Sequence, residues 1–233
     1  MNAPTARERL VVALDLPDLD EAVRLAGRLA GHVGWFKVGL ELFGAWGPEA
    51  VHRIGEHGSV FLDLKLHDIP TTVERAAARL SALGAGLLTV HAGGGPAMLR
   101  AAVQGFASGR VLAVSVLTSL SDEELVLLGE ERAAERVVRL ARVAVEAGVP
   151  GLVCAPPDLV RVRTAIGPDP LVVTPGVRPA GSTPDDHARV ATPGGALEEG
   201  ADLLVVGRPI VRADDPVAAA DGVVAQIAAA EPA

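Results

Sequence analysis

The chain has a single cysteine, Cys154, and therefore cannot form an internal disulfide bond. This residue ends the apolar run Gly151–Cys154, where a small buried hydrophobic side chain is a better interpretation than a nucleophile. Tyrosine is absent, and aromatic residues make up only 3% of the 233 positions. The core must therefore be built mainly from leucine, valine and alanine.

Long apolar runs are also missing from the sequence. No run approaches the roughly 20 residues that a membrane-spanning helix needs. Residues 1–9 lack the apolar stretch of a secretory signal peptide. We therefore expect a soluble cytoplasmic protein that has no membrane partner.

Positive charge is scarce, with 21 Lys and Arg against 29 Asp and Glu and a formal net charge of -8. This balance argues against a nucleic-acid partner held through its phosphates. It does not exclude a small anionic ligand, because a few local cations can dominate the field inside a pocket.

The sequence does contain a regular alternation of short apolar runs and segments with helical periodicity. Two capping boxes support the helices: Asp18 with Glu21, and Ser121 with Glu124, the second placed ahead of a longer helix that ends at Gly148. The eight apolar runs, each a predicted strand, are Leu10–Leu14, Trp35–Val38, Val60–Leu62, Leu87–Val90, Val111–Val116, Gly151–Val153, Leu171–Val173 and Leu203–Val206.

Strand–helix alternation without a break in composition or a long linker predicts one α/β domain over residues 1–233, with a parallel sheet. Eight units favour a closed (β/α)8 barrel, the TIM barrel, over an open doubly wound sheet. The loop after the first strand, Asp15–Asp18, also lacks the G-x-G-x-x-G turn of a dinucleotide-binding fold.

The segment Phe61–Thr72 places three charged residues within six positions, directly after a short apolar run. They are Asp63, Lys65 and Asp68. A buried strand end avoids charges unless their pairing compensates for desolvation. The cluster is therefore either catalytic or a structural ion-pair network, and Lys37 at the end of another strand favours the catalytic interpretation.

The ends of the predicted strands are mostly polar, whereas the strand bodies are almost wholly apolar. In a (β/α)8 barrel the active site lies at the C-terminal ends of the strands. The pattern therefore predicts a pocket there. The residues at these ends are Asp15, Lys37, Asp63 with Lys65, His91, Thr118, Cys154, Thr174-Pro175 and Gly207-Arg208.

The end of the eighth strand has the composition of an anion site. Gly207 allows close backbone approach, and Arg208 adds a cation beside a helix start, which favours phosphate binding over an arginine on a solvated loop. Arg178 is placed to reach the same anion from the seventh connection. That connection, residues 178–192, is long and rich in Gly, Pro, Ser and Asp, so we interpret it as a lid, with a merely mobile insertion as the alternative.

Taken together, these motifs resemble the orotidine 5′-phosphate decarboxylase family over about Leu10 to Arg208. The resemblance implies a (β/α)8 barrel that works as a homodimer, without a metal ion or organic cofactor, and that converts orotidine 5′-phosphate to UMP in pyrimidine biosynthesis. The motifs that carry it are Asp63-x-Lys65-x-x-Asp68, Leu117-Thr118-Ser119, Thr174-Pro175-Gly176-Val177-Arg178-Pro179 and Val206-Gly207-Arg208.

The resemblance also implies a role for each charged residue. Lys65 would donate a proton to C6 of the pyrimidine, and Asp63 would lie beside the substrate carboxylate. Lys37 would pair with Asp63 and contact the ribose, while Asp15 would bind a ribose hydroxyl. Asp68 would reach into the site of the neighbouring subunit, so that each site would be shared between two subunits.

Further substrate contacts follow from the same resemblance. They would join the subunits, read the base and hold the 5′-phosphate. The residues are Ile69 and Thr72 at the neighbouring subunit's site, Thr118 or its neighbour Ser119 at the base, and Arg178 and Arg208 with the Gly207 amide at the phosphate.

One position departs from the family pattern. Where the family usually has a glutamine, about nine residues beyond Arg178, this chain has His187. The glutamine bridges phosphate and base as the lid closes, and histidine cannot copy its donor–acceptor pair. His91 is interpreted either as a group supporting the site or as a packed, hydrogen-bonded structural histidine.

Two other functions stay open. Sugar-phosphate decarboxylases and aldolases of related barrels share the D-x-K-x-x-D pattern but depend on Mg²⁺ held by acidic ligands. The positive charge of Lys37, at the end of the second strand, would repel a metal ion, and Glu41 is the only nearby acidic residue beyond it. A non-catalytic nucleotide-binding barrel could keep both arginines but would have no chemical need of Lys65 and both aspartates. The decarboxylase is therefore favoured.

Overall fold

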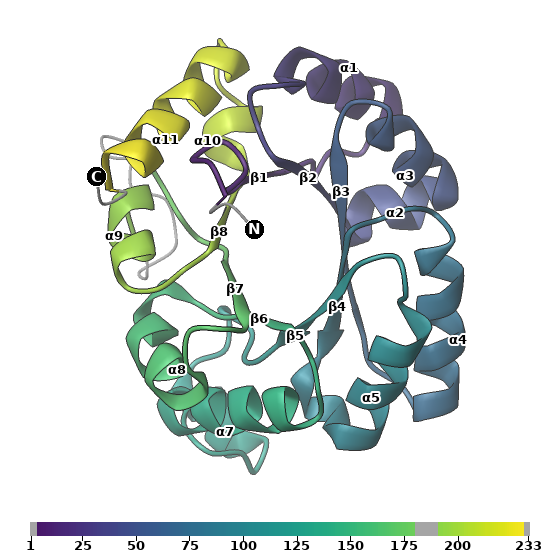
Figure 1. Cartoon of the computed structure of the whole chain (residues 1–233), viewed down its shortest axis with the longest axis vertical. Coiled ribbons are helices and arrows are strands. Elements are labelled where there is room, and N and C mark those ends of the chain that lie inside the picture. The colour runs from purple at the N-terminus through teal and green to yellow at the C-terminus, as the bar shows by residue number, and fades with distance from the viewer. Residues whose placement is uncertain (1–3, 180–190, 231–233) are drawn as a thin grey trace.

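The computed structural model describes residues 4–179 and 191–230. Within these residues, eight parallel strands close into a barrel, because β1 pairs with both β2 and β8, and helices surround the barrel (Figure 1). The (β/α)8 fold expected from the sequence is confirmed. The strands are β1 Leu10–Ala13, β2 Trp35–Gly39, β3 Ser59–Leu66, β4 Leu87–His91, β5 Arg110–Val114, β6 Gly151–Val153, β7 Leu171–Thr174 and β8 Leu203–Val206.

The helices follow the strands in chain order. None of them, within the described residues, is long and apolar enough to cross a membrane. The α-helices are α1 Leu19–Leu29, α2 Leu40–Trp46, α3 Pro48–Gly55, α4 Pro70–Ser81, α5 Gly95–Gly105, α6 Asp122–Leu127, α7 Ala133–Glu146, α8 Leu159–Ile166, α9 Pro193–Glu198, α10 Arg208–Val211 and α11 Pro216–Ala230, and the 3-10 helices are η1 Ala92–Gly94 and η2 Pro156–Asp158.

Two apolar layers hold the fold together. Successive side chains of a strand point to opposite faces, so each strand contributes to both layers. The outer layer packs the strands against the helices and includes Leu10 and Val12. The inner layer fills the barrel with Val11, Ala13, Phe61, Leu87, Leu112, Val173, Leu203 and Val205.

The third strand is longer than the sequence indicates. It extends to Leu66 rather than ending at Leu62, and its register against β4 shifts between these two residues. The sequence interpretation ended the strand where charges begin. The strand continues because Asp63 projects into the polar end of the barrel, and the backbone departs from regular strand geometry at Lys65, whose φ is 49°.

The predicted helix between Ser121 and Gly148 is two helices. The capping box of Ser121 and Glu124 is confirmed, but it starts the short helix α6. Gly129 then adopts a positive φ of 74°, and Glu130 N donates to Leu125 O, which ends α6. The longer helix α7 begins separately at Ala133.

Candidate active site

The inner face of three neighbouring strands changes from apolar to polar toward their C-terminal ends. Phe61 and Leu87 belong to the inner layer. Asp63 and Thr89 lie two positions further along β3 and β4, so they face the same interior. Lys37 on β2 follows Trp35, which packs against the same inner layer. The barrel thus delivers these side chains to one place.

Four of the predicted residues form a chain of alternating charge. Lys37 Nζ lies 2.9 Å from Asp15 Oδ1 and 3.5 Å from Asp63 Oδ2. Lys65 Nζ lies 2.8 Å from Asp63 Oδ1. Lys37 therefore lies beside Asp63, as expected from the sequence, and Asp15 extends the row, so that every charge lies next to one of opposite sign.

The charge chain is most buried in its middle and more exposed at both ends. The side chain of Asp15 is 54% exposed, whereas that of Lys37 is only 10% exposed. Lys65 and Asp63 lie between these limits, at 28% and 16%. Asp15, at the more exposed end, can contact polar parts of a ligand. Lys65, at the other end, is exposed enough for its ammonium to contact the same ligand.

The position of Lys65 depends on an unusual backbone. Its φ is 49°, and among the described residues it is the only one other than glycine with a positive φ. This conformation costs an L-residue roughly 1 kcal/mol or more. Lys65 N donates to Thr89 Oγ1 at 2.9 Å, and Thr89 Oγ1 donates to Asp63 Oδ1 at 2.9 Å.

Thr89 was missed at the level of sequence. Within Leu87–His91 it looks like an ordinary β-branched strand residue, and it is fully buried. The sequence held one indication of its role. Thr89 is a polar residue two positions before His91, so the two side chains point to the same face of the strand, the face that lines the site.

The charge state of the central carboxylate follows from its neighbours. Burial alone would raise the pKa of Asp63, but the positive charges of Lys37 and Lys65 and the hydrogen bonds from Lys65 and Thr89 outweigh it. The pKa of Asp63 is therefore below its ordinary value, and the group is ionised at neutral pH. Lys37 and Lys65 are also the only two lysines in the sequence.

Gly39 leaves room for the outer ion pair. A Cβ atom at this position would lie 2.6 Å from Asp15 Oδ1 and 2.9 Å from Lys37 Nζ. Its φ of -92° and ψ of -174° suit any residue. Glycine is therefore needed here for space and not for backbone freedom.

Asp68, the last residue of the D-x-K-x-x-D motif, and the residues that follow it lie on the surface. Asp68, Ile69 and Thr72 are all exposed at the start of α4, and Ile69 is 67% exposed. Asp68 Oδ1 accepts a hydrogen bond from Ile69 N at 2.6 Å. Asp68 makes no ion pair with any other described residue, so it stands apart from the charge chain of its own subunit.

The predicted anion site lies at the ends of β7 and β8. Arg178 is partly buried and Arg208 is exposed, with Gly207 as the residue that precedes α10. Arg178 N donates to Ala191 O at 3.0 Å, and Val177 pairs with Ala191 in an isolated bridge. The two ends of the predicted lid are thus joined. His187 lies outside the described residues.

The residues predicted to read the base follow β5. Thr118 and its neighbour Ser119 are both exposed, in the loop between β5 and α6. This is the same end of the barrel as the charge chain.

Two histidines lie beside Lys65. The rings of His67 and His91 are 5.4 Å apart with a tilt of 41°. Burial, followed by the charges of His67 and Lys65, holds the pKa of His91 below its ordinary value, against the opposing effect of Asp63. His91 is therefore neutral at pH 7 and adds no charge to the site.

Cys154 is buried, as the sequence indicates. Burial, with a contribution from Asp158, raises the pKa of its thiol to about 12. The thiol is protonated at neutral pH and is no nucleophile.

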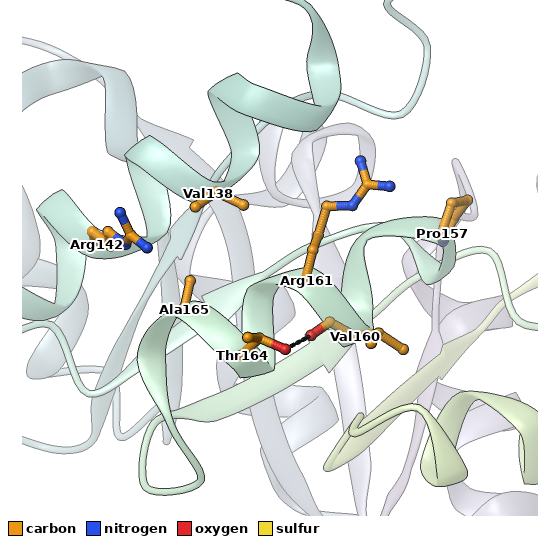
Figure 2. A pocket seen from close by; sticks show the side chains of 7 residues that line it. All are labelled: Val138, Arg142, Pro157, Val160, Arg161, Thr164 and Ala165. Carbon is orange, nitrogen blue, oxygen red and sulfur yellow. Dashed lines mark hydrogen bonds between the residues drawn. The ribbon is translucent and has the colours of Figure 1, made fainter.

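Two further features of the described residues bear on the choice of site. No three His, Cys, Asp or Glu side chains gather there in a metal-binding arrangement. An open groove of about 430 Å³ lies between α7 and α8 on the outside of the barrel, and Figure 2 shows its lining, which includes Val138, Arg142, Val160 and Arg161. It contains none of the predicted site residues.

Comparisons with known proteins point in one direction. The sequence model of a family described as "Orotidine 5′-phosphate decarboxylase / HUMPS family" matches residues 8–223. A relative from Anaeromyxobacter dehalogenans named orotidine 5′-phosphate decarboxylase is 56% identical over 221 residues, covering 94% of this chain and 97% of the relative. One of the same name from Thermobifida fusca is 51% identical, with 94% and 95% covered.

A solved structure is similar over almost the whole chain. The crystal structure of orotidine 5′-phosphate decarboxylase from Lactobacillus acidophilus has a TM-score of 0.84 and 36% sequence identity, and the match covers 97% of this chain and 99% of the other.

Proposed function

Because this chain belongs to the orotidine 5′-phosphate decarboxylase / HUMPS family, we propose that it is a carboxy-lyase that converts orotidine 5′-phosphate to UMP and CO₂ in pyrimidine biosynthesis. The family description joins two groups, so membership alone does not choose the reaction. The names of relatives at 51% and 56% identity support the decarboxylase. The whole chain, residues 1–233, would form one catalytic domain acting in the cytoplasm.

The observation that carries this proposal is the Lys65 ammonium, held 2.8 Å from the ionised Asp63 at the C-terminal end of the barrel. Loss of CO₂ breaks the bond between C6 and the carboxyl carbon and leaves the electron pair on C6. A fixed ammonium beside C6 stabilises that charge. It then gives its proton to C6, forming UMP, and the neutral amine takes a new proton from solvent.

Asp63 would hold Lys65 charged and oriented while lying next to the substrate carboxylate. Repulsion between two carboxylates would raise the energy of the bound substrate before CO₂ leaves. Lys37, paired with Asp15 and Asp63, would contact the ribose together with Asp15. Every carboxylate of the charge chain is paired with a lysine, which supports a reaction that needs no metal ion.

Binding energy would come from groups far from C6. Arg178, Arg208 and the Gly207 amide would hold the 5′-phosphate, and Thr118 or Ser119 would read the base. His187 would take the lid position. Contacts of this kind lower the barrier when they are used to order the catalytic groups.

We further propose a homodimer in which Asp68, Ile69 and Thr72 enter the partner's site. Their exposure, and the separation of Asp68 from the charge chain of its own subunit, support this arrangement. Mixing Lys65→Ala and Asp68→Ala proteins tests it, because a mixed dimer keeps one intact site. Recovery of about a quarter of wild-type activity is expected for random pairing of two-site dimers. No recovery from two separately inactive variants would argue for a site within one subunit.

The reaction itself is tested by ultraviolet absorbance. Purified protein is mixed with orotidine 5′-phosphate in EDTA, and the products are identified as UMP and CO₂. Conversion in EDTA supports a metal-independent decarboxylase. No conversion, with activity on a keto-sugar phosphate once Mg²⁺ is added, would favour the related metal-dependent enzymes. Inactivity toward both would indicate a binding protein.

A further inference from the structure

We propose that Thr89 is a positioning residue that fixes Lys65 and Asp63 relative to each other, an inference that rests on the proposed decarboxylase function. Thr89 lies on β4 and is fully buried. Its hydroxyl accepts from Lys65 N at 2.9 Å and donates to Asp63 Oδ1 at 2.9 Å. The single hydroxyl proton is thus committed to the carboxylate.

These contacts close a ring. Thr89 joins the Lys65 backbone to Asp63, and Asp63 Oδ1 in turn accepts from Lys65 Nζ at 2.8 Å. The backbone N–H of Lys65 is therefore bound to the Thr89 hydroxyl, and its side-chain ammonium is bound to Asp63 Oδ1. A flexible lysine side chain loses much of its freedom in such an arrangement, which suits a group that must meet C6 in one orientation.

The backbone shows why a hydroxyl is needed on β4. At Lys65 the φ is 49° and the register between β3 and β4 shifts. Left-handed backbone in a residue other than glycine persists only where its surroundings determine it. Thr89 Oγ1 gives the Lys65 amide a buried partner at the point where the regular ladder is interrupted.

Three variants separate positioning from general stability. Thr89→Val keeps the shape and removes the hydroxyl, Thr89→Ser restores it, and Thr164→Val removes a hydroxyl from α8, where Oγ1 donates to Val160 O at 2.8 Å (Figure 2). We expect Thr89→Val to lower kcat by about ten-fold or more with KM changed by less than about three-fold. Thr89→Ser should regain most of kcat, and Thr164→Val should match the wild type. If Thr89→Val does not fold, Thr89→Ala takes its place.

A second readout does not depend on activity. Because the chain has only two lysines, [¹⁵N]lysine labelling gives two main-chain amide signals, from Lys37 and Lys65, and Lys37→Arg assigns them. Thr89→Val should shift the Lys65 signal and speed its hydrogen exchange while leaving the Lys37 signal close to its wild-type position.

The outcomes distinguish this inference from the proposed function. An active wild type with unchanged kcat in Thr89→Val, or an unmoved Lys65 amide, would overturn the role of Thr89 alone. A wild type that fails to decarboxylate orotidine 5′-phosphate would overturn the proposed function, whatever the amide signals show. A fall in kcat that Thr89→Ser does not repair would assign Thr89 to packing.

Discussion

Adding one methyl group at Gly39 should damage the site without damaging the fold. The Cβ of Gly39→Ala would lie 2.6 Å from Asp15 Oδ1 and 2.9 Å from Lys37 Nζ. Ordinary contact begins at 3.4 Å, so these atoms must retreat by about 0.8 Å (3.4 minus 2.6) and 0.5 Å (3.4 minus 2.9). Both atoms end flexible side chains, and they can move while the backbone stays in place.

The size of the effect follows from that displacement. A misplacement of about 1 Å can cost up to about 100-fold in rate. We therefore expect kcat/KM to fall about 10- to 100-fold, which corresponds to roughly 1.4–2.7 kcal/mol of transition-state stabilisation. Stability should hold or improve slightly, because alanine in place of glycine at a compatible backbone position adds about 0.4–1 kcal/mol.

The control is Gly44→Ala on α2, where the added Cβ meets nothing within 4 Å. Decarboxylation kinetics and urea unfolding are measured on both variants and on the wild type. Wild-type kcat/KM in Gly39→Ala, with Asp15 and Lys37 displaced, would refute the reasoning that their pairing matters. Equal losses in both variants would point to a general effect of alanine in this region.

Three further predictions concern stability, pH and the thiol. Arg163 binds Asp202 and the carbonyl of Pro170 at the end of the barrel opposite the site. Because the Asp202 side chain is 33% exposed, Arg163→Met should cost about 1–3 kcal/mol of unfolding free energy. The kcat of the folded protein should be unchanged, and a normal urea midpoint would contradict this prediction. The pKa of Asp63 is lower in the folded protein than in the unfolded chain. The ionised carboxylate therefore stabilises the fold above the unfolded pKa, and this stabilisation is lost as pH falls through the folded pKa. The wild type should lose more stability in acid than Asp63→Asn, and equal losses would contradict this prediction. Cys154, with its thiol pKa raised to about 12, should resist iodoacetamide at pH 8 until the protein unfolds, and rapid labelling of the native protein would be the contrary result.

The sequence was sufficient for the barrel because each strand contains a short, mainly apolar run. Runs such as Leu203–Val206 are buried on both faces, as parallel strands in this architecture must be, and they stand out from the polar strand ends. The four residues of the charge chain, Asp15, Lys37, Asp63 and Lys65, were identified because polar residues at the ends of successive apolar strands are easy to recognise.

Other features could be recognised only in the folded structure. The extension of β3 through Lys65 was missed because charges interrupt its apolar pattern, and no local signal announces a positive φ at a lysine. Thr89 was missed because its role depends on the register between β3 and β4. The division between α6 and α7 could have been predicted from the sequence, because Gly129, a residue that often ends a helix, follows soon after the capping box of Ser121.

The most direct test of the central claim is the turnover of Lys65→Ala on orotidine 5′-phosphate, compared with the wild type in EDTA. An ammonium that both stabilises the carbanion and delivers the proton should be worth about 1000-fold or more in kcat. We predict such a loss in a protein that unfolds with a normal urea midpoint. Near-wild-type conversion to UMP by Lys65→Ala would contradict the account.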